Sequence, residues 1–465
     1  MNIYPLHSPS QRDFAIHDVA NANRFAEMHH NKVLFDHTYR EWYVWDEQHW
    51  AKDHRNSIMD LAKETAYRIH ADAPRDNRDW QRQAVAIFSR NGLRNMLECA
   101  KSLPELSTTA EDWDRDPYLF NVHNGTIDLR TSTLREHRPE DRITMLAGCA
   151  FDPQAEAPHF ISCLEQYWPD MLGEDLGIAE FLITCMGYCL SGLNNEKLLI
   201  LLHGAGDTGK TTIMRALQAT WGEYFKTADW STFAHQRNGD TGKHRTDLVR
   251  LKGARIVSAS EGDDGCRMSE GIIKRVTGRT PLVVRDLMSK PISFLPEFKL
   301  WFDTNGFPSF PGQDRAMWNR VRGIFFKRVI SFEDQQRFRE EHGDLDQLLA
   351  AEASGILNLA MQGWQEYQRH QGIPIPEAIG AATTSFHMAA DSLGQFLDDR
   401  CMVEHDSRIT KTDFYTHYIQ WSRQQGENPP SSKQITRWMV ERGFTEVKSH
   451  GIRYWMGIRT TEPHQ

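Results

Sequence analysis

The chain has 465 residues, of which 40% are hydrophobic and 25% are charged, as in an ordinary globular protein. This length exceeds the size at which a single hydrophobic core stops growing, so we expect two to four domains. The net charge of −9 by itself argues against a nucleic-acid partner. Residues 196–330, however, contain 22 Lys and Arg against 14 Asp and Glu, and this basic centre is compatible with a polyanionic partner.

The sequence predicts neither a membrane protein nor a secreted protein. No run of about 18 apolar residues is present, so neither a membrane-spanning helix nor a membrane partner is predicted. The N-terminus lacks the basic and then apolar pattern of a secretory signal. The seven cysteines do not have the spacing of a disulfide framework or a zinc site, and Cys185 and Cys189 are predicted to be buried. We therefore expect a cytoplasmic protein in a reducing compartment.

The first half of the chain mixes strand-like and helical patterns. Residues 41–50 are strand-like and residues 78–103 are helical, and their spacing predicts an α+β region. Residues 120–143 predict a hairpin, with Asn124 and Gly125 in its turn. Residues 158–192 have helical spacing. The aromatic residues between 42 and 50 favour a core hairpin, with base stacking as the alternative; they are Trp42, Tyr43, Trp45 and Trp50.

The centre of the chain alternates strands with helices. Apolar runs at 196–204, 254–262 and 298–306 predict buried strands, and residues 210–222 predict a helix. This alternation predicts an α/β fold with a mostly parallel sheet that is covered on both faces. Residues 348–370 predict a further helix, followed by a proline-containing linker. Residues 431–458 predict helix, turn, strand, turn and strand, which is the order of a winged helix.

The pentapeptide GDTGK occurs at 206–210 and again at 239–243. The first copy belongs to a GxxxxGK[ST] motif between a predicted strand and a predicted helix, a context that places backbone N–H groups around a phosphate. Lys210 is predicted to reach the β- and γ-phosphates and Thr211 to bind Mg²⁺. The predicted nucleotide-binding residues are Gly204, Ala205, Gly206, Asp207, Thr208, Gly209, Lys210, Thr211 and Thr212.

The second copy lacks every additional requirement of that motif. Arg237 stands where the first glycine should be, and His244 follows the lysine. No apolar strand precedes it. We therefore interpret it as a loop, and we expect its Lys243, His244 and Arg245 to face DNA or a neighbouring subunit.

Hydrolysis of a nucleotide needs further groups beyond a phosphate loop. Glu261 ends a predicted strand and is the candidate for activating water, with a solvated strand-end acid as the alternative. Asn305 ends another strand and is the candidate that contacts the attacking water or the γ-phosphate, with a simple turn residue as the alternative. Arg320 is the candidate arginine finger, and Arg315 and Arg322 are close rivals.

Four ordered motifs, GAGDTGKTT, LKGARIVSASE, IKRVTGRTPLVVRDLMSKPISFLPEFKLWFDTN and WNRVRGIFF, resemble the superfamily-three helicases. The similarity is to the ATPase half of phage and plasmid primase-helicases, extends over roughly residues 115–465, and implies a P-loop, AAA+-like core that uses ATP and Mg²⁺. It places Lys210 and Thr211 on Walker A, Glu261 on Walker B and Asn305 on the polar sensor. Ser260 departs from the paired acids common in many such ATPases, which leaves Asp263, Asp264 or water as helpers of Mg²⁺.

The resemblance also implies a ring, expected to be a hexamer, in which an arginine finger completes the site of the neighbouring subunit. Asn319 stands where relatives often have the first of two arginines, which favours Arg320 as the finger. Residues 283–294 resemble the channel hairpin that grips single-stranded or forked DNA, with Lys290 at its tip and Arg285 nearby. Lys274 and Arg275 are weaker DNA candidates, and ordinary solvated surface is the alternative for each of these side chains.

The resemblance and the element pattern together divide the chain. The expected parts are an α+β region (1–115), a helical collar (116–195), the ATPase (196–335), a helical extension and linker (336–385) and a winged helix (386–465). The winged helix is expected to bind duplex DNA or, alternatively, a protein, because its helix and wing contain Lys433, Arg437, Arg442, Lys448 and Arg453.

The first 115 residues show no convincing pair of strand-borne acids and no zinc knuckle, so no primer synthesis is expected from this chain. We expect a replicative DNA helicase of a phage, plasmid or integrated element, working beside a separate primase or initiator in a bacterial or phage-infected cell. The alternative is a nucleic-acid-stimulated ATPase that acts as a switch or an assembly scaffold without unwinding.

Overall fold

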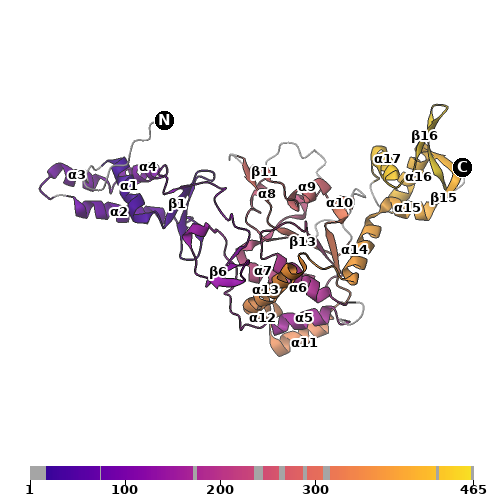
Figure 1. The fold of residues 1–465 in the computed structure, drawn as a ribbon, viewed down its shortest axis with the longest axis horizontal. Coiled ribbons are helices and arrows are strands. Elements are labelled where there is room, and N and C mark those ends of the chain that lie inside the picture. The colour runs from indigo at the N-terminus through magenta and orange to yellow at the C-terminus, as the bar shows by residue number, and fades with distance from the viewer. Residues whose placement is uncertain are drawn as a thin grey trace.

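The computed structural model describes residues 17–73, 75–170, 175–234, 245–260, 268–285, 291–306, 315–425 and 429–461. The N-terminal helices lie at one end of the long axis, a parallel sheet with its helices lies in the middle, and a small α+β group lies at the other end (Figure 1). Separate hydrophobic clusters fill these regions, two of them against the central sheet. Among the described residues, no helix is long and apolar enough to cross a membrane.

The N-terminal group combines four helices with a small sheet of order β3-β2-β1-β4. The predicted helix 78–103 is two helices, because the Ser89 side chain accepts a hydrogen bond from the Gly92 N–H and begins a new helix. Tyr43 and Trp50 are buried beside Trp113, as the predicted core hairpin requires. The elements are α1 (Asp18–His29), β1 (Val33–Asp36), β2 (Glu41–Trp45), β3 (Trp50–Lys52), α2 (Ile58–Asp72), α3 (Arg78–Ala86), α4 (Arg90–Ala100) and β4 (Ser107–Thr108).

A three-stranded antiparallel sheet and two helices follow. The predicted hairpin at 120–143 is a meander of β5 (Leu119–Val122), β6 (Gly125–Asp128) and β7 (Thr133–Arg135). Helices α5 (Pro158–Tyr167) and α6 (Ile178–Tyr188) pack with it in the larger central cluster, where Cys185 and Cys189 are fully buried as predicted.

The central sheet has five parallel strands in the order β14-β8-β13-β10-β9. Along β8, Leu199 and Leu201 belong to one core cluster and Ile200 and Leu202 to the other, so the strand is apolar on both faces. The predicted α/β fold with a mostly parallel sheet is thereby confirmed. The strands are β8 (Leu199–His203), β9 (Phe225–Thr227), β10 (Ile256–Ser260), β13 (Lys299–Thr304) and β14 (Val321–Phe325).

Helices cover both faces of this sheet. The predicted helix at 348–370 is two helices separated at Glu352. The carboxylate of Glu352 accepts hydrogen bonds from the N–H groups of His159 and Phe160 at the start of α5. A short hairpin, β11 (Leu282–Val284) and β12 (Ile292–Phe294), leads into β13. The helices are α7 (Lys210–Trp221), α8 (Thr246–Val249), α9 (Glu270–Val276), α10 (Arg315–Trp318), α11 (Phe332–His342), α12 (Leu345–Ala351), α13 (Ala353–His370) and α14 (Glu377–Ala390).

The C-terminal group has the order helix, strand, helix, helix, strand, strand around its own core. The predicted helix, strand and strand over 431–458 are α17 (Ser432–Glu441), β16 (Glu446–Ser449) and β17 (Ile452–Thr460). The sequence analysis missed β15 (Cys401–Thr410), which pairs with β17 but exposes most of its mainly polar residues. Helices α15 (Ser392–Arg400) and α16 (Lys411–Gln424) complete the group.

Candidate nucleotide-binding site

The predicted phosphate-binding residues lie at one edge of the parallel sheet. Residues 204–209, the glycine loop, connect the end of β8 to the start of α7, and Lys210 is the first residue of that helix. Strand β8 lies between β14 and β13, so all three strands end beside this loop. Ligands of open α/β sheets bind at such carboxyl edges.

Two glycines allow the loop to pack closely on its surroundings. A Cβ atom at Gly209 would come within 2.2 Å of the Tyr167 ring at the end of α5, and this glycine has a φ of +96°. A Cβ atom at Gly204 would come within 2.5 Å of the carbonyl oxygen of Phe326. By contrast, a Cβ atom at Gly206 would meet no atom within 4 Å. The collar helix α5 and the segment after β14 therefore support the loop.

Lys210 joins the glycine loop to the neighbouring strand. Its side chain is 5% exposed, and its Nζ donates hydrogen bonds to the carbonyl oxygens of Gly204 (2.7 Å) and Ala205 (2.8 Å). The same Nζ donates to Oδ1 of Asn305, 3.1 Å away and 95 residues later in the chain. The structure thus brings together the lysine and the asparagine that the sequence analysis assigned to one site.

Asp303 belongs to this site but was missed. The Oγ1 of Thr211 donates to Oδ2 of Asp303 at 3.2 Å, and Oδ1 of Asp303 lies 3.9 Å from Nζ of Lys210. The sequence could have placed Asp303 at this site, because it precedes Asn305 by two residues on a predicted strand and therefore points to the same face of the sheet. Glu261 lies outside the described residues.

The donor set is chemically suited to a nucleotide phosphate with a hard cation. The N-terminus of the 12-residue helix α7 favours an anion, and the buried ammonium of Lys210 adds positive charge. The hydroxyl of Thr211 and the carboxylate of Asp303 are oxygen ligands of the kind that Mg²⁺ prefers. The residues present therefore fit Mg²⁺ and ATP, the cofactors that the resemblance implies.

Arg320 is not brought to this site within one chain. It directly precedes β14, and its carbonyl accepts a hydrogen bond from the N–H of Leu199 at the start of β8. It therefore lies at the amino edge of the sheet, one five-residue strand or about 16 Å from the glycine loop. Its guanidinium donates to Oγ1 of Thr277 (3.1 Å) and to the carbonyl of Ala316.

The two rival arginines lie near the same edge. Arg322 donates to the carbonyl oxygens of Asn319 (3.0 Å) and Val321 (2.8 Å), and burial lowers the pKa of its guanidinium. Arg315 opens α10. The contacts of Arg322 hold it along its own strand, which makes it a poorer candidate than Arg320 for reaching a neighbour.

The candidate DNA-binding residues lie on α9 and the β11–β12 hairpin. Arg285 is exposed directly after β11, and the two strands pair antiparallel as the predicted hairpin requires. Lys290, predicted at the tip, lies outside the described residues. Lys274 is held by Glu270 one turn earlier, with 3.2 Å between Nζ and Oε2, so α9 offers less positive charge than its sequence predicts.

The interpretation of the second GDTGK loop is partly wrong. Residues 239–243 and His244 lie outside the described residues. Arg245, which we expected to face DNA or a neighbouring subunit, instead pairs with Asp247 (2.9 Å) and donates to the carbonyl of Thr232. Its side chain is only 13% exposed. Asp247, only two residues away in sequence, was a signal for this local ion pair.

The basic residues of the C-terminal group divide into two kinds. Arg442 pairs with Asp391 at the start of α15 and ties α17 to that helix, which corrects its assignment to a DNA-facing surface. Arg437 pairs with Glu441, and Arg453 with Glu446. Lys433 and Lys448 are exposed.

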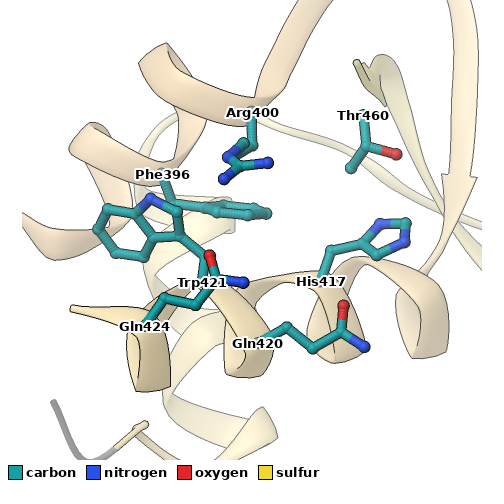
Figure 2. Close-up of a pocket in the computed structure, with 7 residues that line it drawn as sticks. All are labelled: Phe396, Arg400, His417, Gln420, Trp421, Gln424 and Thr460. Carbon is teal, nitrogen blue, oxygen red and sulfur yellow. The ribbon is translucent and has the colours of Figure 1, made fainter. Parts of the chain in front are cut away.

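A small hollow in the same group lies between α15, α16 and the end of β17 (Figure 2). Phe396 and Trp421, both buried, form its apolar wall, while Arg400 and His417 line its polar side. The indole N–H of Trp421 donates to Oδ2 of Asp399. None of the predicted nucleotide-binding or catalytic residues lines this hollow, so it is separate from the glycine loop.

Comparisons with known proteins give a family match and viral relatives. Residues 22–169 match a family model described as D5 N terminal like. A protein of Acanthamoeba polyphaga mimivirus, provisionally named a helicase, is 23% identical over 350 residues, which is 72% of this chain and 36% of the relative. A protein of African swine fever virus (strain Badajoz 1971 Vero-adapted), provisionally named a primase, is 21% identical over 369 residues, or 74% of this chain and 37% of the relative.

The chain thus spans little more than a third of the length of these two relatives. A solved apo structure of the NrS-1 C-terminal region covers 91% of this chain and 95% of its own, with a TM-score of 0.44 and 12% identity. The family match over residues 22–169 and the viral relatives named as helicases and primases support a relationship of this chain to the primase-helicase family.

Proposed function

We propose that the chain is an ATP-dependent DNA helicase that acts on single-stranded and forked DNA during replication of a mobile element or virus. The contact between Lys210 and Asn305 carries this proposal, because it joins a glycine loop to the polar end of the neighbouring strand. A phosphate loop alone binds a nucleotide, whereas hydrolysis needs a second polar group beside the γ-phosphate. The names of the relatives support the same activity.

The residues at the carboxyl edge of the sheet have different proposed roles in hydrolysis. Bound Mg²⁺-ATP would supply the phosphoryl group that is transferred to water. Lys210 would exchange the carbonyl oxygens of Gly204 and Ala205 for phosphate oxygens, keeping its ammonium partnered throughout. Asn305 would orient water or the γ-phosphate from the adjacent strand. Glu261, which lies outside the described residues, remains the predicted group that takes the proton from that water.

Arg320 would act between subunits. Because it lies at the opposite edge of the sheet from Lys210, it can reach the phosphates only of a neighbouring copy. Such a head-to-tail contact closes into a ring when its rotation allows, and we expect a hexamer. The mass of the assembly, measured with an ATP analogue and single-stranded DNA, checks the ring number.

DNA would be held by two parts of each subunit. The β11–β12 hairpin, with Arg285 at its described edge, would follow the phosphate backbone of one strand without reading sequence. Lys290, outside the described residues, remains the residue predicted at its tip. The C-terminal group has the strand and helix order of a winged helix, and exposed Lys433 and Lys448 suit it for duplex DNA. A separate primase or initiator remains the expected partner.

Unwinding of a tailed duplex tests the proposal. Wild-type protein should hydrolyse ATP faster with single-stranded DNA and should displace the annealed strand, and Lys210→Ala should lose both activities. If the wild type hydrolyses ATP with DNA stimulation but displaces no strand, the chain is instead a nucleic-acid-dependent switch or scaffold. Absence of nucleotide binding by the wild type would contradict both functions.

Mixing experiments test the intersubunit finger. Arg320→Ala subunits keep an intact loop but lack the finger, whereas Lys210→Ala subunits have the reverse defect. A mixture of the two variants should regain ATP hydrolysis that neither shows alone, and Arg322→Ala subunits should need no such rescue. Failure to regain activity at every mixing ratio would contradict action between subunits.

A further inference from the structure

We propose that Asp303 supplies, from β13, the magnesium-site carboxylate that β10 lacks. In many P-loop ATPases two acids end the strand that carries the catalytic glutamate, but here Ser260 precedes Glu261. The inference rests on the proposed nucleotide site and adds a residue to it. It assigns to Asp303 a role in holding Mg²⁺ or a water molecule bound to it.

The register of the parallel sheet puts the two positions side by side. Ser260 on β10 pairs directly with Asp303 on β13. Register partners on adjacent strands point to the same face of a sheet. On β13 the same face also presents Trp301, which packs in the cluster around α7. A carboxylate at Asp303 therefore occupies the space next to the position where β10 would otherwise have an acid.

The contacts of Asp303 direct it to the cation-binding side of the site. Its Oδ2 accepts from the hydroxyl of Thr211, at 3.2 Å, and this hydroxyl is the predicted Mg²⁺ ligand at the start of α7. A carboxylate in this position would orient the Thr211 oxygen toward the ion and accept hydrogen bonds from its water molecules. Mg²⁺ in nucleotide sites retains several waters, so one carboxylate beside the hydroxyl is sufficient.

A competing role is a clamp on the lysine. Oδ1 of Asp303 lies 3.9 Å from Nζ of Lys210, although the shorter contacts of that ammonium go to Gly204, Ala205 and Asn305. A clamp acts on nucleotide binding whether or not Mg²⁺ is present. A magnesium-site carboxylate acts only when Mg²⁺ is present. The two roles are therefore separated by the dependence of nucleotide binding on Mg²⁺.

Binding of a fluorescent, non-hydrolysable ATP analogue, measured in EDTA and in a Mg²⁺ titration, tests this assignment. Asp303→Asn should bind the analogue in EDTA as the wild type does. The Mg²⁺ concentration needed for half-maximal tightening should rise by about 10-fold to 100-fold, the usual cost of losing a carboxylate that supports a metal ligand. Asp229→Asn, which removes an exposed carboxylate two strands away, is the matched control and should leave the titration unchanged.

A relocation variant sharpens the test. Ser260→Asp combined with Asp303→Asn moves the acid from β13 to its register partner on β10. This double variant should bring the Mg²⁺ concentration needed for half-maximal tightening most of the way back to the wild-type value. An equal loss of affinity in EDTA and in Mg²⁺ would show a clamp on Lys210 and overturn the inference, as would an unchanged titration in a folded Asp303→Asn protein. If the wild type itself binds no analogue, the proposed nucleotide site fails instead.

Discussion

The two edges of the central sheet each bury a lysine, but the surroundings of the two lysines differ. At the carboxyl edge, Lys210 donates to loop carbonyls and to Asn305, beside the exposed hydroxyl of Thr211. At the amino edge, Lys299 is fully buried, donates to the carbonyls of Ser191 and Glu297, and lies 4.6 Å from the ring of Tyr188. Both lysines have hydrogen-bond partners within the chain.

Burial of a charged side chain therefore does not by itself mark a functional site. The carboxyl edge combines its lysine with a glycine loop, a helix N-terminus and polar side chains from a second strand, so a ligand can take over the partners of Lys210. The amino edge surrounds Lys299 with Arg255, Glu297 and aromatic rings that have no such exchangeable role. We expect the first edge to control activity and the second to control stability.

Substitution of Arg255 should produce the largest loss of stability at the amino edge. This guanidinium is 2% exposed and pairs with Glu297 at 2.7 Å. Arg255→Leu would leave that carboxylate, which is only 18% exposed, without its partner, which should lower the free energy of unfolding by about 3–5 kcal/mol. Urea unfolding measures the change. The matched control is Arg459→Leu, which breaks the exposed pair with Glu404 and should have a much smaller effect; equal effects would contradict the assignment.

Loss of the lysine at each edge separates activity from stability. Lys210→Ala should reduce ATP hydrolysis by about 100-fold to 1,000-fold, the usual cost of removing one donor to transition-state charge. Lys299→Met should lower stability but leave hydrolysis per folded molecule close to that of the wild type. Steady-state hydrolysis, corrected for the folded fraction, distinguishes them. A folded Lys299→Met protein without activity would mean that the amino edge also takes part in catalysis.

Local patterns predicted most of the central elements but not the contacts between them. Strand β8 and helix α7 could be predicted because an apolar run and a glycine motif lie next to each other in sequence. The presence of Asp303 at the site could be predicted from its spacing to Asn305, but its position beside Ser260 could not, because that depends on the pairing of two strands. The contact between Glu352 and His159 joins residues 193 positions apart, and the mainly polar β15 has no apolar alternation to reveal it.

Alanine substitutions in the glycine loop test how closely the loop packs against its surroundings at the carboxyl edge. At Gly209 the new Cβ would meet the ring of Tyr167, and the φ of +96° is unfavourable for a side chain. Gly209→Ala should therefore lower the free energy of unfolding by about 1–3 kcal/mol. Gly206→Ala, where the Cβ meets no atom within 4 Å, should change it by less than about 0.5 kcal/mol. Thermal unfolding compares the pair, and equal losses would contradict the observed packing.

The smallest expected effect is a pH dependence that originates at Lys299. Burial lowers the pKa of this lysine to about 7, with a further lowering by Arg255 that is opposed by Cys189 and Glu297. Above that pH the folded chain has lost a proton that the unfolded chain keeps until about pH 10.4. Unfolding then takes up a proton, so this group makes the folded state more stable as the pH rises.

The comparison of wild type with Lys299→Met isolates this contribution from other titrations. Between pH 7 and about pH 8, below the pKa of about 8.5 of thiols in the unfolded chain, the wild type should gain about 1 kcal/mol relative to the variant. Urea unfolding of both proteins at several pH values measures the difference. A difference that stays constant with pH would mean that Lys299 keeps its proton in the folded chain. The amino edge would then bury a charged lysine throughout this pH range.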